Sequence, residues 1–466
     1  MIKIQRNVVY CSLLYIFIFI TLNIFNQFYN MDFFALIIYF SLLYIIFRFK
    51  REILIKYMFM VVMFTYHICS VFTVENFPNF IDNLQVMSYH SGAFLPLLTS
   101  YVLGFITILI LEMNRNSKIL KTKNISEKNG IKIGNMVISN KSQIKLVSFI
   151  LIAVTMVMII KIGKNGFYSM GGIDRFAYRE NYFSSFDSKF YTYISWFLPI
   201  PLICANNGMK KRAYFFFVIY CFYLIWVGDK FGSLFLAFYF YLLVHWATKK
   251  LDKKKVRTLI IMIFFVLLIL MLFISYQVFY ERGSISEIYE YFNNRLIGGQ
   301  SDLWWGVFTK ETNSGWRLGE FFKDELSAIF SQPDSWMDYN FGIYKMMRVT
   351  APAWVVNNYL SRGVRFAAST QATLYYYFKY TGLYLGGILM FVLYFFVVNK
   401  AIKAYKNNDI LSSVCYTMLL SKSIQLTTMS AIDMLGNTTT ILCLFYLLIK
   451  HQFEFRKRKE MRIESE

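Results

Sequence analysis

The sequence predicts an all-α, polytopic membrane protein with about 12 transmembrane helices, one large external loop and one mid-length external loop. Composition is the first reason. Of the 466 residues, 57% are hydrophobic and 16% are charged, whereas soluble domains average about 45–50% apolar and about 25% charged residues. The second reason is that apolar runs long enough to cross a bilayer recur along the whole chain. The third is that lysine and arginine fall mainly in the short segments between these runs.

A helix needs about 20 apolar residues to cross the hydrocarbon core of a membrane. This criterion predicts spans at residues 8–25, 31–47, 53–72, 93–113, 144–162, 190–205, 213–227, 231–247, 258–279, 373–398, 410–428 and 432–449. Pro199 and Pro201 lie in the sixth span, where proline removes a backbone donor and is expected to kink or break the helix. No small-x-small cleavage site follows the first run, so we expect a retained helix rather than a signal peptide.

The charge distribution predicts the orientation, because lysine and arginine favour the cytoplasmic side. With the N-terminus inside, the inner segments carry 32 of the 49 lysines and arginines, and the outer loop 73–92 carries none. Both termini are therefore expected in the cytoplasm. The organisation is then membrane helices at 1–162, an external loop at 163–189, helices at 190–279, a large external loop at 280–372, helices at 373–450 and a basic cytoplasmic tail at 451–466.

The sequence lacks the motifs that are typical of several classes of protein function. The six cysteines lie in apolar runs without a CxxC, and the four histidines show no HExxH spacing, so we expect no metal and no cofactor. No DxD, GxSxG or Walker A sequence occurs. The formal charge of +22 does not indicate a nucleic-acid partner, because basic loops beside apolar runs report membrane orientation.

Arginine is frequent in the two outer segments, with eight arginines against five lysines. A guanidinium is a planar fork of donors that suits phosphate and carboxylate groups. The predicted substrate-binding arginines are Arg175, Arg179, Arg282, Arg295 and Arg348. Arg175 and Arg179 have i, i+4 spacing, which puts both on one helix face. The alternative is salt bridging to the acidic residues of the large loop.

Tryptophans and carboxylates complete the candidate site. Trp304 and Trp305 are predicted to bind sugar rings, and the alternative for an indole in this loop is to anchor at the membrane interface. Glycosyl transfer to a hydroxyl needs a base near the acceptor oxygen. Asp302 is the first candidate for that base and Glu180 the second. Asp229 has an ion pair as its simpler interpretation.

Two further patterns stand out. Residues 314–330 have helical periodicity with an apolar face that would lie along the membrane interface or pack on other external parts, while Lys323, Asp324 and Glu325 would face water. Charges within predicted spans usually face the protein interior or a water-filled cavity. The charged residues within the predicted spans are Lys379, Lys422 and Asp433. They favour a transporter as an alternative function.

This architecture resembles the bacterial O-antigen and capsule polymerases of the Wzy type. Family members are known for arginine-rich outer loops, some with an Arg-x10-Gly pattern in each of the two main loops. Arg295 and Gly306 have this spacing in the large loop, whereas no glycine stands at the matching distance from Arg175 or Arg179.

The resemblance implies an inverting, metal-independent glycosyltransferase in the bacterial inner (cytoplasmic) membrane. It would take a polyprenyl-diphosphate-linked glycan, such as one on undecaprenyl diphosphate, and transfer it onto a second lipid-linked repeat unit. Membrane lipid and a chain-length regulator are the expected partners. The alternatives are a lipid-linked oligosaccharide flippase, an O-antigen ligase and a multispan scaffold subunit of the assembly machinery.

Overall fold

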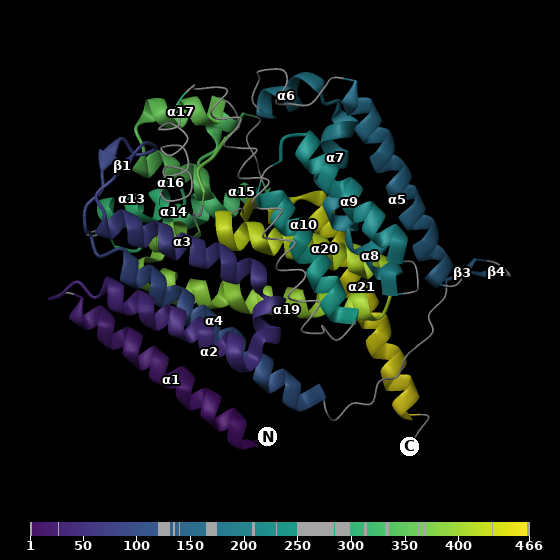
Figure 1. The fold of residues 1–466 in the computed structure, drawn as a ribbon, viewed down its shortest axis with the longest axis horizontal. Coiled ribbons are helices and arrows are strands. Elements are labelled where there is room, and N and C mark those ends of the chain that lie inside the picture. Colours follow the sequence, from purple (N-terminus) through teal and green to yellow (C-terminus); the bar gives the residue numbers. More distant parts are fainter. Residues whose placement is uncertain are drawn as a thin grey trace.

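The computed structural model describes residues 2–26, 28–119, 131–133, 136–138, 140–164, 175–206, 210–229, 231–248, 284, 299–311, 315–330, 335–361, 364–367, 370–430 and 432–463. Within these ranges the chain is almost entirely helical (Figure 1). Two short antiparallel hairpins, β1–β2 (Phe80–Ile81 with Val86–Met87) and β3–β4 (Ile131–Ile133 with Met136–Ile138), are the strands of this part of the chain.

The helices of the first half of the chain are α1 (Ile2–Phe25), α2 (Asp32–Lys56), α3 (Met58–Asn76), α4 (Phe94–Ile119), α5 (Asn140–Gly163), α6 (Arg175–Tyr182), α7 (Ser185–Phe197), α8 (Pro199–Asn206), α9 (Lys210–Trp226) and α10 (Phe231–Thr248). Those of the second half are α13 (Asp302–Lys310), α14 (Leu318–Phe321), α15 (Ser327–Phe330), α16 (Gly342–Thr350), α17 (Ala353–Ser361), α18 (Thr370–Thr381), α19 (Gly387–Lys406), α20 (Ile410–Met429) and α21 (Thr438–Ile463). Two π-helical turns, Phe322–Leu326 and Gly382–Gly386, and two 3₁₀ turns, Trp336–Asp338 and Ile432–Gly436, complete this half.

The described part of the chain contains five helical stretches long and apolar enough to cross a membrane: Asp32–Lys56, Met58–Asn76, Phe94–Arg115, Ser142–Gly163 and Thr370–Lys406. Their outward surfaces are apolar. On α5, for example, the side chains of Leu146, Phe149, Val157 and Ile160 are exposed. Large exposed apolar surfaces are rare on soluble monomers, so the architecture is compatible with insertion of these helices into a bilayer.

Most predicted spans coincide with helices, and the differences have local causes. The sixth span is broken into α7 and α8 at Pro199, as its prolines predict. The predicted loop after residue 47 is instead part of α2, which is kinked at Lys50, and the chain turns only at Tyr57. The tenth span is interrupted by non-helical backbone at Lys379. The ninth span, at 258–279, lies outside the described residues.

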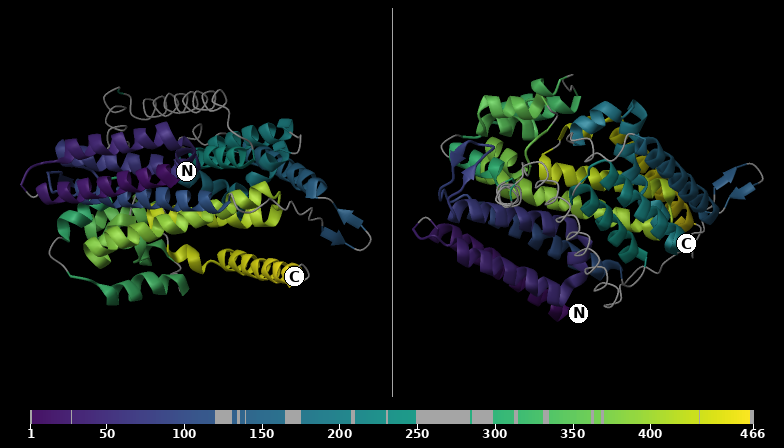
Figure 2. Two further views of the ribbon diagram at one scale, coloured as in Figure 1. Left: turned by 90° about the horizontal axis from the view of Figure 1, so that it is seen from below. Right: turned by 45° about the horizontal axis from the view of Figure 1, so that its top comes forward.

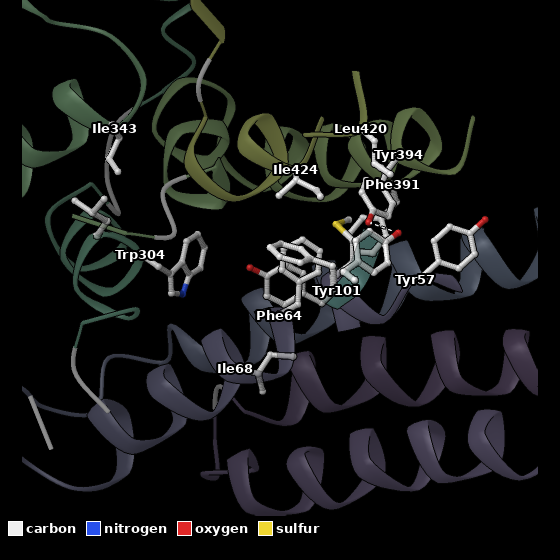
Figure 3. Packing of buried hydrophobic residues seen from close by; sticks show 14 of the residues in the cluster. Tyr57, Phe64, Ile68, Tyr101, Trp304, Ile343, Phe391, Tyr394, Leu420 and Ile424 are labelled. Atoms are coloured by element: carbon white, nitrogen blue, oxygen red, sulfur yellow. Dashed lines mark hydrogen bonds between the residues drawn. The ribbon is translucent and has the colours of Figure 1, made fainter. Parts of the chain in front are cut away.

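The core is continuous from the membrane helices into the large loop. The central helix α4 packs against α1, α2, α3 and α19, and these helices run side by side in two views (Figures 1 and 2). Phe64 stacks on Tyr101 with ring centroids 4.2 Å apart, and Phe391 lies 5.2 Å from Phe64. Trp304 of α13 belongs to the same buried cluster (Figure 3). The large loop is therefore anchored in the core.

The two ends of the bundle differ in character. The N-terminus, the C-terminus and the β3–β4 hairpin lie toward one end (Figure 1). The β1–β2 hairpin with α6, α13, α16 and α17 lies toward the other, which we call the loop end (Figures 1 and 2). The helices that the structure describes in the two predicted external loops thus lie toward the loop end.

The helical segment from Leu318 to Phe330 departs in part from the predicted faces: Lys323 is exposed as predicted, whereas Asp324 and Glu325 are not. Glu325 is buried and Asp324 is largely buried, whereas the aromatic side chains of Phe322 and Phe330 are 54% and 87% exposed. The prediction that Asp324 and Glu325 face water was wrong, because both have partners inside the protein. Glu325 accepts from the Gly342 backbone N–H at 2.6 Å and from the Tyr377 hydroxyl at 3.1 Å. The aromatic face is left on the surface.

Candidate functional site at the loop end

A network of ionic side chains lies where α13, α14, α16 and α18 meet. We call it the loop-end ion cluster, and its members are Glu311, Arg317, Glu320, Asp324, Lys345 and Lys379. The elements that position it are held by the aromatic core, since Phe308 of α13 stacks on Tyr375 of α18 with ring centroids 5.3 Å apart. Three cations and four carboxylates, counting Glu325 beneath Asp324, converge from segments far apart in the sequence.

Arg317 is the centre of this cluster. Its Nη2 donates to the Glu311 carboxylate at 2.5 Å, and its Nη1 donates to the Tyr376 hydroxyl. The guanidinium also lies over the Tyr376 ring, with Cζ 4.3 Å from the ring centroid. The Arg317 backbone N–H donates to the Tyr377 carbonyl at 2.8 Å, which fixes the chain entering α14. Stacking and bidentate hydrogen bonding are the modes in which arginine outperforms lysine.

Lys379 approaches the same carboxylate from α18 under backbone strain. Its Nζ donates to the Glu311 carbonyl at 2.7 Å and lies 3.8 Å from the carboxylate. Its φ is 54° and its ψ is −144°, a region that side-chain-bearing residues rarely adopt. Such strain is of order 1–3 kcal/mol and concentrates at functional sites. Lys379 lies within the apolar helical stretch Thr370–Lys406, which has 37 residues, whereas about 20 suffice to span a hydrocarbon core.

The cluster opens to the surface on one side. The Glu320 side chain is 45% exposed and that of Arg317 is 25% exposed, while Asp324 and Lys379 are largely buried. Arginine and lysine sharing one carboxylate can exchange that carboxylate for an incoming anion of matching geometry. A diphosphate has the bidentate oxygens that such a pair binds.

Asp302 occupies a second, buried position at the opposite end of α13. Its Oδ2 accepts a hydrogen bond from Asn83 Nδ2 at 2.5 Å, and Asn83 in turn accepts from the Tyr359 hydroxyl at 2.6 Å. The other carboxylate oxygen, Oδ1, is buried and takes no hydrogen bond from any described residue. Burial raises the pKa of Asp302 from 3.8 to about 7, and the nearby Asp82 adds to this rise. Asp302 is therefore able to exchange a proton near neutral pH.

One short helix joins the two positions. Asp302 begins α13 and Glu311 follows its last residue, so at about 1.5 Å per residue they stand roughly 14 Å apart along the axis. Only 3% of Asp302 is exposed, and Asn83 of the β1–β2 turn is bonded to its carboxylate.

The other predicted arginines divide into those with partners and those outside the described residues. Arg179 forms an ion pair with Asp229 at 2.6 Å and lies over the Tyr191 ring at 4.3 Å. Asp229 is therefore paired with Arg179, and Lys230, its neighbour in sequence, lies outside the described residues. Arg348 donates to backbone carbonyls of Met337 and Tyr339.

Arg175, Glu180, Arg282 and Arg295 are the remaining predicted site residues. Arg175 begins α6, but its side chain is not described, and Glu180 is exposed on the same helix. Arg282 and Arg295 lie outside the described residues, as does any groove they would share with Arg179. They remain predictions.

The two candidate tryptophans lie inside the protein. Trp304 is fully buried and donates to the Ala93 carbonyl at 2.9 Å. Trp305 is 2% exposed and donates to the Tyr89 carbonyl at 3.3 Å. Neither ring offers a face to a sugar in this conformation. Trp316 and Trp354, at 64% and 62% exposure, are the accessible indoles of the described loop.

Sequence reasoning did not assign a site role to the cations that meet in the cluster: Arg317, Lys345 and Lys379. Two signals were present. Arg317 adjoins Trp316 in the arginine-rich loop, and Lys379 is a charge inside an apolar run, which usually faces the protein interior. The convergence of Arg317 and Lys379 on Glu311 depends on tertiary packing.

A model of a protein family described as a family of unknown function (DUF6418) matches residues 337–444. The matched region runs from the 3₁₀ turn before α16 through α20 and into α21, and so contains Lys345 and Lys379 but not Glu311 or Arg317. No curated protein and no solved structure matches the chain. Over this region the chain is similar to that family.

Proposed function

We propose that this protein polymerises polyprenyl-diphosphate-linked oligosaccharide repeat units at the outer face of the bacterial inner membrane, in O-antigen or capsule assembly. The loop end is the outer face and both termini are cytoplasmic. The observation that carries the proposal is geometric. Asp302 is a buried carboxyl whose Oδ1 has no partner among the described residues, and it begins the short helix α13. Glu311, just after that helix, is bound by Arg317 and Lys379.

The reaction uses both ends of α13. An acceptor hydroxyl on one lipid-linked repeat unit attacks the anomeric carbon of the growing chain. The bond from that carbon to the diphosphate breaks, and the polyprenyl diphosphate leaves. Asp302, ionised, takes the proton of the acceptor hydroxyl. Arg317 and Lys379 stabilise the negative charge that develops on the leaving diphosphate.

Two features favour a transferase over a flippase. A flippase needs cations in a central cavity between helices, whereas these cations meet at the loop end beside α13. A general base has no task in moving a lipid across a membrane. The exposed aromatic face of the segment Leu318–Phe330 suits contact with the membrane interface, where a lipid-linked substrate resides.

The test is deletion of the gene followed by gel analysis of surface glycan. Loss of a polymerase leaves core plus a single repeat unit, whereas loss of a flippase or ligase removes even that. Complementation separates roles within the site. Asp302→Asn and Arg317→Ala are expected to leave the single-unit product at normal protein level.

The matched controls are exposed residues of the same loop. Lys323→Ala and Asp338→Asn change equivalent charges on the surface and are expected to restore full-length glycan. A deletion strain without the single-unit band, or normal chain lengths with Asp302→Asn, contradicts the proposal.

A further inference from the structure

A second constellation lies at the ends of α2 and α3, separate from the loop-end ion cluster. Asp32 is the first residue of α2, Glu75 is in the last turn of α3, and His90 precedes α4. One ligand atom from each lies within 4.8 Å of the other two. His90 Nδ1 is 3.3 Å from Glu75 Oε2 and 3.8 Å from Asp32 Oδ2. Three chemically suitable donors thus surround one point.

Asp32 is buried with an unsatisfied oxygen. Its exposure is 0%, and its Oδ1 takes no hydrogen bond from any described residue. Its Oδ2 accepts from Asn76 Nδ2 at 3.1 Å. A buried carboxylate oxygen without a partner is unfavourable, and an ion bound beside it removes that deficit.

Glu75 is held in place by the chain that carries His90. Its carboxylate accepts from the backbone N–H of Ser91 at 2.9 Å, the backbone N–H of Gly92 at 2.8 Å and the Ser91 hydroxyl at 2.5 Å. These donors fix the orientation of the carboxylate before any ligand arrives. Residues 73–92 contain no lysine or arginine, so His90 is the one basic side chain of this loop.

We propose that Asp32, Glu75 and His90 bind a divalent transition-metal ion of the Zn²⁺ class. Two carboxylates with one imidazole suit zinc, whereas Ca²⁺ and Mg²⁺ select oxygen ligands alone. Zinc bonds of about 2.0–2.2 Å place tetrahedral ligand atoms about 3.4 Å apart. The two His90 separations of 3.3 and 3.8 Å are close to this value. The exposed side of His90 leaves room for water as a fourth ligand.

The ion ties the first helices to the candidate site. The loop that it fixes also carries Asn83, the partner of Asp302, and Tyr89, whose carbonyl accepts from Trp305. The role is therefore structural, and it is independent of the proposed polymerase activity.

The experiment uses the full-length chain, purified in detergent without a polyhistidine tag and stripped with a chelator. Zn²⁺ is added, unbound ion is removed, and bound zinc is measured by mass spectrometry alongside the thermal midpoint. The wild type is expected to retain about one zinc per chain and to melt higher with zinc. Asp32→Asn and His90→Ala are expected to lose this zinc. Asn76→Ala, which removes the hydrogen bond that orients Asp32, is expected to weaken binding by about 10–100-fold.

Matched controls are Glu52→Gln and His451→Ala, exposed residues elsewhere in the chain, which are expected to bind zinc as the wild type does. His90→Ala leaves the Glu75 hydrogen bonds intact, so a folded variant is available. Less than about half an equivalent of zinc on the wild type overturns the proposal. So does unchanged binding by both Asp32→Asn and His90→Ala, or equally tight binding of Mg²⁺.

Discussion

Replacing Asp302 with asparagine is expected to flatten the pH dependence of stability. The folded chain holds the Asp302 proton up to about pH 7, whereas the unfolded chain releases it near 3.8. Below about pH 4 both states are protonated and the group contributes no difference. Between about pH 4 and pH 7 Asp302 is ionised only in the unfolded chain, so the free energy of unfolding falls as the pH rises. Above about pH 7 both states are ionised and the curve levels off.

The magnitude follows from the same two values. Each tenfold difference in proton affinity corresponds to about 1.4 kcal/mol, so the full effect of raising the pKa from 3.8 to about 7 is roughly 4 kcal/mol. About 2–3 kcal/mol of this falls between pH 5 and pH 8, the range in which a membrane protein is readily handled. Asparagine keeps the shape and the hydrogen bond from Asn83 but does not titrate.

The assay is unfolding of the purified protein in mixed micelles by a denaturing detergent, followed by tryptophan fluorescence at pH 5, 6, 7 and 8. The wild type is expected to lose about 2–3 kcal/mol more than Asp302→Asn across this series. Asp338→Asn, on an exposed carboxyl, is the control and should follow the wild type. Parallel curves for wild type and Asp302→Asn would show that Asp302 is not a buried acid.

Three further predictions use the same unfolding assay. A Cβ on Gly436 would lie 1.7 Å from a backbone carbonyl oxygen of α15, so Gly436→Ala should lower the free energy of unfolding by about 1–3 kcal/mol. Gly319 has open space around it, so Gly319→Ala should not. Equal effects of the two substitutions would contradict the packing around Gly436. The Lys379→Gly protein should be about 1–2 kcal/mol more stable than the Lys379→Ala protein, because both substitutions remove the side chain and only glycine adopts a positive φ without strain. Equal stability of the two variants would exclude backbone strain at residue 379. A double-mutant cycle on Arg179 and Asp229, joined at 2.6 Å, should give a coupling of about 1–3 kcal/mol, and a value near zero would mean that the pair is not formed.

The positions of most helices could be predicted from the sequence because the criterion, the length of an apolar run, depends only on consecutive residues. Apolar length alone located α5, α9, α10 and α20 within four residues of their ends, whereas α1 begins six residues before its predicted start and α4 ends six residues after its predicted end. Proline chemistry predicted the break at Pro199. The break at Lys379 has no such local signal, and the partner of its side chain, the Glu311 carbonyl, is distant in sequence.

The candidate site was predictable only in part, for a physical reason. A buried carboxyl and a surface carboxyl look the same in sequence, so Asp302 could be proposed from its neighbours but not its burial. The unexpected burial of Asp324 and Glu325 in the segment Leu318–Phe330 has the same origin. Glu325 is buried because Gly342 and Tyr377, distant in sequence, supply its donors, and periodicity contains no information about them.

The most direct test of the central claim is the glycan profile of a gene-deletion strain complemented with Asp302→Asn. The expected result is core plus one repeat unit, with variant protein at wild-type level and no less stable than the wild type at pH 8. That combination separates loss of chemistry from loss of fold. Full-length glycan from the same strain would contradict the assignment of Asp302, and absence of the single-unit band in the deletion strain would contradict polymerase activity itself.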